Sequence, residues 1–308
     1  FVEQFKDFLG SSTIHRIVIW GGEPMVYWTK TVKPLLEGLI HAGICPKDKF
    51  MITTNGRKMA DDYVKFANEN PVWTTISAHE WGFTKEQEDR FFKLERFSIS
   101  SIIHGKHISL FDLRAHFYRL LQSYLRPPRL YAHYVRANDG CAKEFYLTKA
   151  NVDAFCFHLI KEVLPLALSG DMWARWQLAQ LLSERRKELA KGNESKCILS
   201  DRLAIDLHGN KYECHHNYDA KNIIGNIFSK AIPIYPEEKH IDPFKYSDSA
   251  SCRSCHVFNE CHGGCYLSNT HEVDCYMAKK LHAVYTILEG YPWTRFTGTP
   301  MFGFGKGA

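Results

Sequence analysis

Hydrophobic positions in the first 165 residues form two alternating patterns. Short, continuous apolar runs rich in Ile, Val and aromatic residues predict β-strands at 16–20, 50–54, 73–78, 97–103 and 129–135. The segments between them carry apolar residues at helical spacing, which predicts helices at 1–9, 29–42, 59–68, 84–94, 110–124 and 151–164. Uninterrupted apolar strands are typical of a parallel sheet covered by helices. Strand followed by helix, five times over, therefore predicts an α/β fold.

The helix predicted at 1–9 precedes every visible strand. One further strand upstream would complete a sixth strand–helix unit. We therefore expect a partial (β/α)6 TIM-type barrel that lacks its first strand in this chain. Since residue 1 is Phe rather than Met, the chain is expected to be truncated at its N-terminus.

The second half has a different pattern. An amphipathic helix at 171–191 is followed by two short strands, 203–207 and 211–214, joined by His208-Gly209-Asn210, which predicts a β-hairpin. Loops dense in Cys, His, Asn and Gly come next, then a helix at 276–288. The expected organisation is a barrel domain at 1–170, a bridging helix at 171–194, a small Cys-rich domain at 195–290 and a tail at 291–308.

Composition excludes two classes of protein. The chain has 308 residues, of which 45% are hydrophobic and 14% aromatic, so it is not predominantly disordered. Its apolar runs are far shorter than the roughly 20 residues of a membrane-spanning helix. The net charge of +5 is mild, and a solvated surface explains it more simply than a nucleic-acid partner. Since no secretory signal is present, we expect a cytoplasmic protein without a membrane partner.

Seven of the ten cysteines lie within residues 197–275. Close spacing of thiols in a chain without a secretory signal favours metal ligands over disulfides. The strongest motif is a run of four cysteines with two, five and three residues between them. Iron–sulfur clusters, zinc and disulfides all remain possible at this point. The seven cysteines are Cys197, Cys214, Cys252, Cys255, Cys261, Cys265 and Cys275.

Small and polar residues end the first three predicted strands. Gly21-Gly22-Glu23-Pro24 follows the first strand, Thr53-Thr54-Asn55-Gly56 ends the second, and Ser77 lies at the end of the third. Ligands bind at the carboxyl ends of parallel strands in α/β folds. Two glycines allow close approach to the backbone, and the Glu23 carboxylate suits a cationic ammonium group.

The seven cysteines, with Gly209 between the first two, resemble the SPASM domain found at the C-terminus of many radical SAM enzymes. Gly21-Gly22-Glu23-Pro24 resembles the motif by which these enzymes hold the amino group of S-adenosylmethionine (AdoMet). The resemblance implies a cofactor site that includes Asn55 and Ser77, and two auxiliary 4Fe-4S clusters. One cluster would be held by Cys252, Cys255, Cys261 and Cys275, and the other by Cys197, Cys214 and Cys265. Arg90 and Arg96 are candidates for the cofactor carboxylate, although a surface role is the simpler interpretation for each.

The resemblance further implies an enzyme that reductively cleaves AdoMet to a 5′-deoxyadenosyl radical and oxidatively modifies a peptide or protein, with a reductant such as flavodoxin or ferredoxin. The sequence departs from the family in one respect. The Cys-x3-Cys-x2-Cys loop that binds the AdoMet cluster is absent, since no cysteine precedes Cys45. We expect that loop, and a third 4Fe-4S cluster, in an upstream segment. The alternative is a catalytically inactive scaffold or binding protein that has lost the loop.

Overall fold

A computed structural model describes most of the first half of the chain and parts of the second. The described residues are 1–10, 14–44, 49–78, 82–103, 109–134, 143–189, 204–212, 223–228, 252, 254–261 and 271–291.

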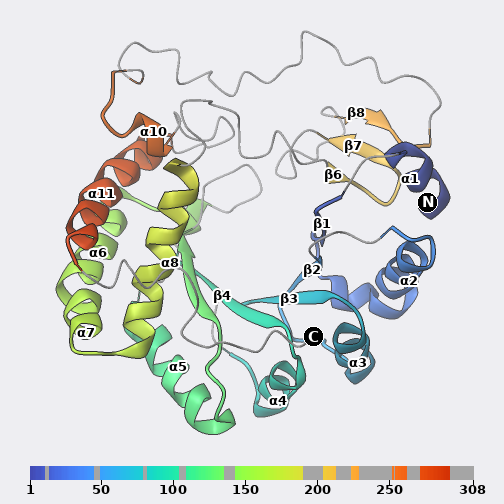
Figure 1. The fold of residues 1–308 in the computed structure, drawn as a ribbon, viewed down its shortest axis with the longest axis horizontal. Helices are drawn as coiled ribbons and strands as arrows, with labels where there is room; N and C mark the ends of the chain where they lie inside the picture. Colours follow the sequence, from blue (N-terminus) through green and yellow to red (C-terminus); the bar gives the residue numbers. More distant parts are fainter. Residues whose placement is uncertain are drawn as a thin grey trace.

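The central element is a parallel sheet whose strands follow one another in chain order (Figure 1). All five strands match their predicted bounds to within one residue, and the α/β fold with a parallel sheet is confirmed. The fifth ends at Tyr134, which is the last described residue before the gap at 135–142. The strands are β1 (Arg16–Ile19), β2 (Lys49–Thr54), β3 (Val72–Ser77), β4 (Phe97–Ile103) and β5 (Leu130–Tyr134).

Helices cover the outer face of this sheet (Figure 1). Phe50, Ile52, Val72 and Ile76 are at most 1% exposed because alternate residues of β2 and β3 point toward these helices. The helices of this half are α1 (Val2–Leu9), α2 (Lys33–His41), α3 (Asp61–Glu69), α4 (Lys85–Lys93), α5 (Leu110–Tyr124), α6 (Lys149–His158) and α7 (Leu164–Leu168).

Two predicted helices are less regular than their hydrophobic spacing suggests. The helix predicted at 29–42 begins with the 3-10 turn η1 (Pro24–Tyr27) and the π-helical turn η2 (Trp28–Val32) before α2. The helix predicted at 151–164 extends to Leu168, with the π-helical turn η4 (Leu159–Val163) between α6 and α7. Both π turns precede a proline, Pro34 or Pro165, which lacks the N–H that a continuous α-helix needs.

The described residues of the second half form a small antiparallel sheet and three further helices. The predicted hairpin is confirmed as β6 (Ala204–Ile205) and β7 (Asn210–Tyr212), and β8 (Ile223–Asn226) extends it to three strands. This sheet lies beside α1, because the Phe228 and Phe1 rings are 5.9 Å apart (Figure 1). The helices are α8 (Met172–Leu189), α10 (Phe258–Cys261) and α11 (His271–Glu289); α11 begins five residues earlier than predicted. A short 3-10 turn, η3 (Lys143–Phe145), precedes α6.

The short apolar runs of the sequence predict that no helix spans a membrane. In the described portion of the chain, none of the helices combines the length and the apolar character that crossing a bilayer requires.

Candidate cofactor site

The predicted cofactor residues lie on one edge of the parallel sheet. Gly21 to Pro24 follow β1, Asn55 follows β2, and Ser77 is the last residue of β3. Because Ile19 pairs with Ile52, and Thr54 pairs with Ile76, the three strand ends are neighbours. The tertiary structure thus brings together residues that are more than 50 positions apart in the sequence.

Glu23 joins the first two of these segments. Its Oε1 accepts hydrogen bonds from the Met25 backbone N–H at 3.0 Å and from the Thr54 hydroxyl at 2.5 Å. Its Oε2 accepts from the Asn55 backbone N–H at 2.7 Å. Hydrogen bonds to an ionised carboxylate are stronger than those between neutral groups. Glu23 therefore fixes the loop after β1 to the end of β2.

Gly21 and Gly22 form the exposed part of this loop. Their φ angles are +97° and +56°, which L side chains rarely adopt. A Cβ at either position would have no heavy atom within 4 Å, so open space surrounds both residues. A ligand can therefore approach the backbone of Gly21 and Gly22 directly.

Ser77 lies on the face of the sheet that points away from α3. Thr74, on the same strand, shares a hydrogen bond of 2.6 Å with the Tyr63 hydroxyl of α3. Thr74 therefore faces the helices. Alternation then places Trp73, Thr75 and Ser77 on the opposite face. That face is polar in its described part, because Ser98 contacts both the Trp73 indole N–H, at 3.2 Å, and the Thr75 hydroxyl, at 3.4 Å.

Neither candidate arginine lies at this edge. Arg90 forms ion pairs with Glu86 at 2.6 Å and with Asp61 at 3.6 Å on the helical layer. Arg96 precedes β4 and donates to the backbone carbonyls of Ala67, Asn68 and Asn70 at 3.2, 3.1 and 2.6 Å, at the end of α3. Both guanidinium groups are thus engaged in structural contacts, in agreement with the simpler interpretation of the sequence.

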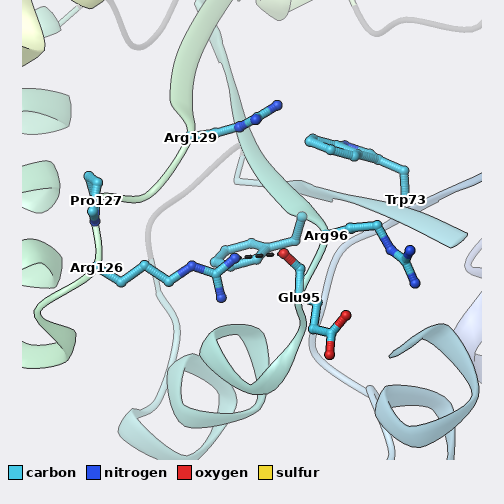
Figure 2. Close-up of a pocket in the computed structure, with 7 residues that line it drawn as sticks. Trp73, Glu95, Arg96, Arg126, Pro127 and Arg129 are labelled. Atoms are coloured by element: carbon cyan, nitrogen blue, oxygen red, sulfur yellow. Dashed lines mark hydrogen bonds between the residues drawn. The ribbon is translucent and has the colours of Figure 1, made fainter. Parts of the chain in front are cut away.

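Arg96 borders a small pocket at the amino-terminal ends of β3, β4 and β5 (Figure 2). Arg126 donates to the carbonyls of Leu94 and Glu95 at 2.9 and 2.6 Å. Arg129 lies over the Trp73 ring, 4.7 Å from its centroid. Since Arg96 donates to carbonyls at the end of α3 and Arg126 to carbonyls of the segment before β4, we assign this pocket a structural role at the edge opposite the cofactor residues.

Four of the seven predicted ligand cysteines are described: Cys252, Cys255, Cys261 and Cys275. All four are half-buried and none forms a disulfide. The Cys255 N–H donates to the Cys252 carbonyl at 3.0 Å, so these two cysteines lie in a tight turn directly before α10. Cys261 ends α10, and Cys275 lies in the second turn of α11. Cys197, Cys214 and Cys265 lie outside the described residues.

The described thiols do not converge on a single point. Among the residues that the structure describes, no three His, Cys, Asp or Glu side chains are grouped so that they could hold one metal ion. A tetrahedral zinc site needs all its thiolates within about 2.3 Å of the ion. An iron–sulfur cluster is larger than an ion and takes its thiolates at separate corners. Cysteine thiols that are not in disulfides are the donor type that an iron–sulfur cluster takes.

A polar network next to these cysteines has no signal in the sequence. Arg185 of α8, Glu260 of α10 and His282 of α11 meet around the Glu260 carboxylate. Arg185 falls within the helix predicted at 171–191, and the other two follow no motif. Only the packing of the three helices brings them together.

Comparison with known proteins gives structural matches only. No family model and no curated protein sequence matches the chain. Native anSMEcpe with bound AdoMet superposes with a TM-score of 0.67 and 16% identity, covering 97% of this chain and 89% of the other. Native anSMEcpe with AdoMet and the Cp18Cys peptide gives a TM-score of 0.63 and 16% identity, over 94% and 90%.

A second protein gives a similar result. SuiB of Streptococcus suis, bound to S-adenosylmethionine, superposes with a TM-score of 0.55 and 14% identity, covering 86% of this chain and 65% of SuiB. At these identities the likeness concerns the fold. The chain therefore has the fold of these AdoMet-bound structures, and its predicted resemblance to radical SAM enzymes with a SPASM domain is confirmed at that level.

Proposed function

We propose that the protein is a radical SAM enzyme that binds AdoMet at the edge formed by Gly21 to Pro24, Asn55 and Ser77. The observation that carries this proposal is the set of three hydrogen bonds to the Glu23 carboxylate. These bonds hold an exposed, glycine-containing loop in place at the carboxyl ends of the strands, where α/β folds bind ligands. The AdoMet present in the similar structures supports the same assignment.

The proposed contacts assign different roles to the backbone and the side chains. The amino group of AdoMet is a cationic donor, and the backbone carbonyls of Gly21 and Gly22 are acceptors that no Cβ covers. Glu23 positions these carbonyls, because its carboxylate already accepts three bonds from the protein. Ser77 offers a hydroxyl from the polar face of β3, and Asn55 marks the other side of the same site.

The cysteines complete the proposed cofactor set. Cys252, Cys255, Cys261 and Cys275 would hold one auxiliary 4Fe-4S cluster, and Cys197, Cys214 and Cys265 the other. A further cluster, held by a three-cysteine loop upstream of Phe1, would bind AdoMet. When bound, these groups would supply a hydrogen-abstracting radical and a path for electrons. The role of the chain would be to orient the reactants and to exclude water from them.

We further propose that the substrate is a peptide or protein. The parallel sheet would form the wall of a partial (β/α)6 barrel at 1–170, whose polar inner face bears Trp73, Thr75 and Ser98. The cluster domain at 195–290 would follow the bridging helix. The peptide in the anSMEcpe complex supports a peptide substrate for this fold. A small electron-transfer protein such as flavodoxin or ferredoxin would act as reductant.

The experiment compares AdoMet binding to wild type and to Glu23→Gln by titration calorimetry under anaerobic conditions. A glutamine is neutral and places an N–H₂ group where an acceptor is needed. Loss of hydrogen bonds to a charged group costs about 1.5–3 kcal/mol, so we expect affinity to fall by about 10-fold or more. The matched control, Glu69→Gln, alters an exposed carboxylate at the end of α3 and leaves affinity unchanged.

Activity then separates the enzyme from a scaffold. The full-length protein, reconstituted with iron and sulfide and reduced with dithionite, is expected to convert AdoMet to 5′-deoxyadenosine and methionine. Absence of AdoMet binding in wild type contradicts the cofactor assignment. Binding without 5′-deoxyadenosine formation by the full-length protein supports the inactive scaffold instead.

A further inference from the structure

The Glu260 carboxylate connects three helices at the cysteine-rich end of the chain. Its Oε1 accepts a hydrogen bond from Arg185 of α8 at 2.8 Å and lies 2.7 Å from Nδ1 of His282 on α11. Arg185 also forms an ion pair with Glu289 of α11 at 2.6 Å. The Arg185 and Glu260 side chains are only 8% and 11% exposed, so solvent screens these contacts weakly.

Glu260 adjoins a proposed cluster ligand in the sequence, and His282 contacts two residues that do so. Glu260 directly precedes Cys261 in the sequence. The His282 ring is 5.3 Å from the ring of His256, which directly follows Cys255. One side chain of α11 therefore contacts the neighbours of two cysteines in the 252–261 segment.

The same face of α11 bears the fourth cysteine. Cys275 precedes His282 by seven residues, which is two turns, so both project from one face about 10 Å apart along the helix axis. The contact between His282 and Glu260 turns this face toward α10. In the complete fold, α10 lies at one end of α8 and α11 (Figure 1).

Local backbone hydrogen bonds and one buried side chain shape the segment from Cys252 to Cys261. Val257 is 1% exposed and anchors the turn by burial. Backbone hydrogen bonds within this segment link Cys255 to Cys252, Phe258 to Cys255, and both Glu260 and Cys261 to Val257. These bonds are local and shape the turn, but they do not set its position against α11. The Glu260 carboxylate links the segment to two helices, through Arg185 of α8 and His282 of α11.

We infer that His282, with Glu260 and Arg185, is a positioning residue that docks the segment bearing Cys252, Cys255 and Cys261 onto the face of α11 that bears Cys275. The inference rests on the proposed function, since it assumes that these four thiols hold one cluster. Beyond the proposed function, the inference names the residues that position the four thiols relative to one another. Groups that orient metal ligands typically change metal affinity by about 10–100-fold when removed.

The test uses the anaerobically reconstituted protein and measures iron and sulfide per chain, the EPR spectrum after reduction, and helix content by circular dichroism. We expect His282→Leu to lose about four irons per chain, one 4Fe-4S cluster, with unchanged helix content. His282→Asn keeps a donor near the position of Nδ1 and should retain the cluster. The matched control, His158→Leu, removes a histidine at the end of α6 that pairs with Glu162 of η4, and this variant should also retain the cluster.

Two further variants make the outcome decisive. Cys261→Ser must lower iron content, and if it does not, the proposed ligand set is wrong whatever His282 does. If Cys261→Ser loses iron but His282→Leu keeps wild-type iron and an unchanged EPR spectrum, the positioning role is overturned.

Should His282→Leu fail to fold, the Glu260→Gln variant tests the positioning role instead. This variant preserves side-chain shape, and we expect a chelator to remove iron from it about 10-fold faster than from wild type. An unchanged rate overturns the inference.

Discussion

Thr54 Oγ1 and Glu23 Oε1 lie 2.5 Å apart, although 31 residues separate them in the sequence. The same hydroxyl accepts a hydrogen bond from the Gly56 backbone N–H at 3.0 Å. Thr54 is only 2% exposed, so water cannot replace either bond. This pair connects the two loops that form the candidate cofactor site.

Replacing Thr54 by Val should therefore weaken both the fold and the site. Valine has the same shape but leaves Glu23 and the Gly56 N–H each without one partner, which costs about 1–3 kcal/mol of unfolding free energy. Urea denaturation measures that loss, and calorimetry should show weaker AdoMet binding. Thr54→Ser keeps the hydroxyl and serves as the control. Equal stability of the Val and Ser variants would contradict the role of the hydroxyl.

Gly56 is expected to tolerate no side chain. Its φ is +72°, and a Cβ would lie 2.7 Å from Cζ of Phe91. Gly56→Ala therefore combines backbone strain with a steric clash, each costing about 1–3 kcal/mol. Gly43→Ala is the matched control, because Gly43 has a φ of +73° but no heavy atom within 4 Å of its Cβ. The difference between their unfolding free energies measures the clash, and equal values would rule it out.

Asp171 should make the stability of the α5–α8 contact depend on pH. Burial raises the pKa of its carboxyl, but hydrogen bonds from the Ala174 N–H and from Arg114 outweigh burial, and the net pKa is lowered. A lowered folded-state pKa stabilises the fold above the ordinary value, about 4, and this contribution is lost as the pH falls through the folded-state pKa.

We therefore expect Asp171→Asn to destabilise the protein by about 2 kcal/mol at pH 7. The gap between variant and wild type should stay constant down to about pH 5 and shrink below about pH 4. Asp7→Asn replaces an exposed carboxylate on α1 and serves as the control. Urea denaturation across this pH range provides the measurement, and a gap that widens in acid would refute the expectation.

The thiol of Cys156 should react slowly with alkylating reagents in the folded protein. Burial in α6, with a smaller effect of Asp153, raises the pKa of its thiol to about 11. Because only the thiolate is nucleophilic, alkylation by iodoacetamide at pH 8 should be about 100-fold slower in the folded protein than in urea. Mass spectrometry of the labelled peptides gives the rate for Cys156. Equal rates in both states would show that its thiol is not shielded.

Local patterns predicted the parallel sheet well because they depend on short-range chemistry. The bounds of β4 and α5 match the expected ranges, since apolar runs and helical spacing mark both. β8 was not predicted, because four residues with Gly225 and Asn226 carry no strand pattern of their own. It forms where β7 offers a free edge. α11 begins before its predicted start because its first turn is polar and charged.

The sequence by itself determined which elements form and which thiols and loop residues are available for chemistry. Side-chain periodicity, prolines and glycines act within a few residues, so they can be recognised without a structure. The tertiary structure alone decided that Glu23 binds Thr54 and Asn55, that Arg96 faces the opposite edge, and that His282 meets Glu260. These contacts depend on strand register and helix packing, which bring together residues that no local pattern relates.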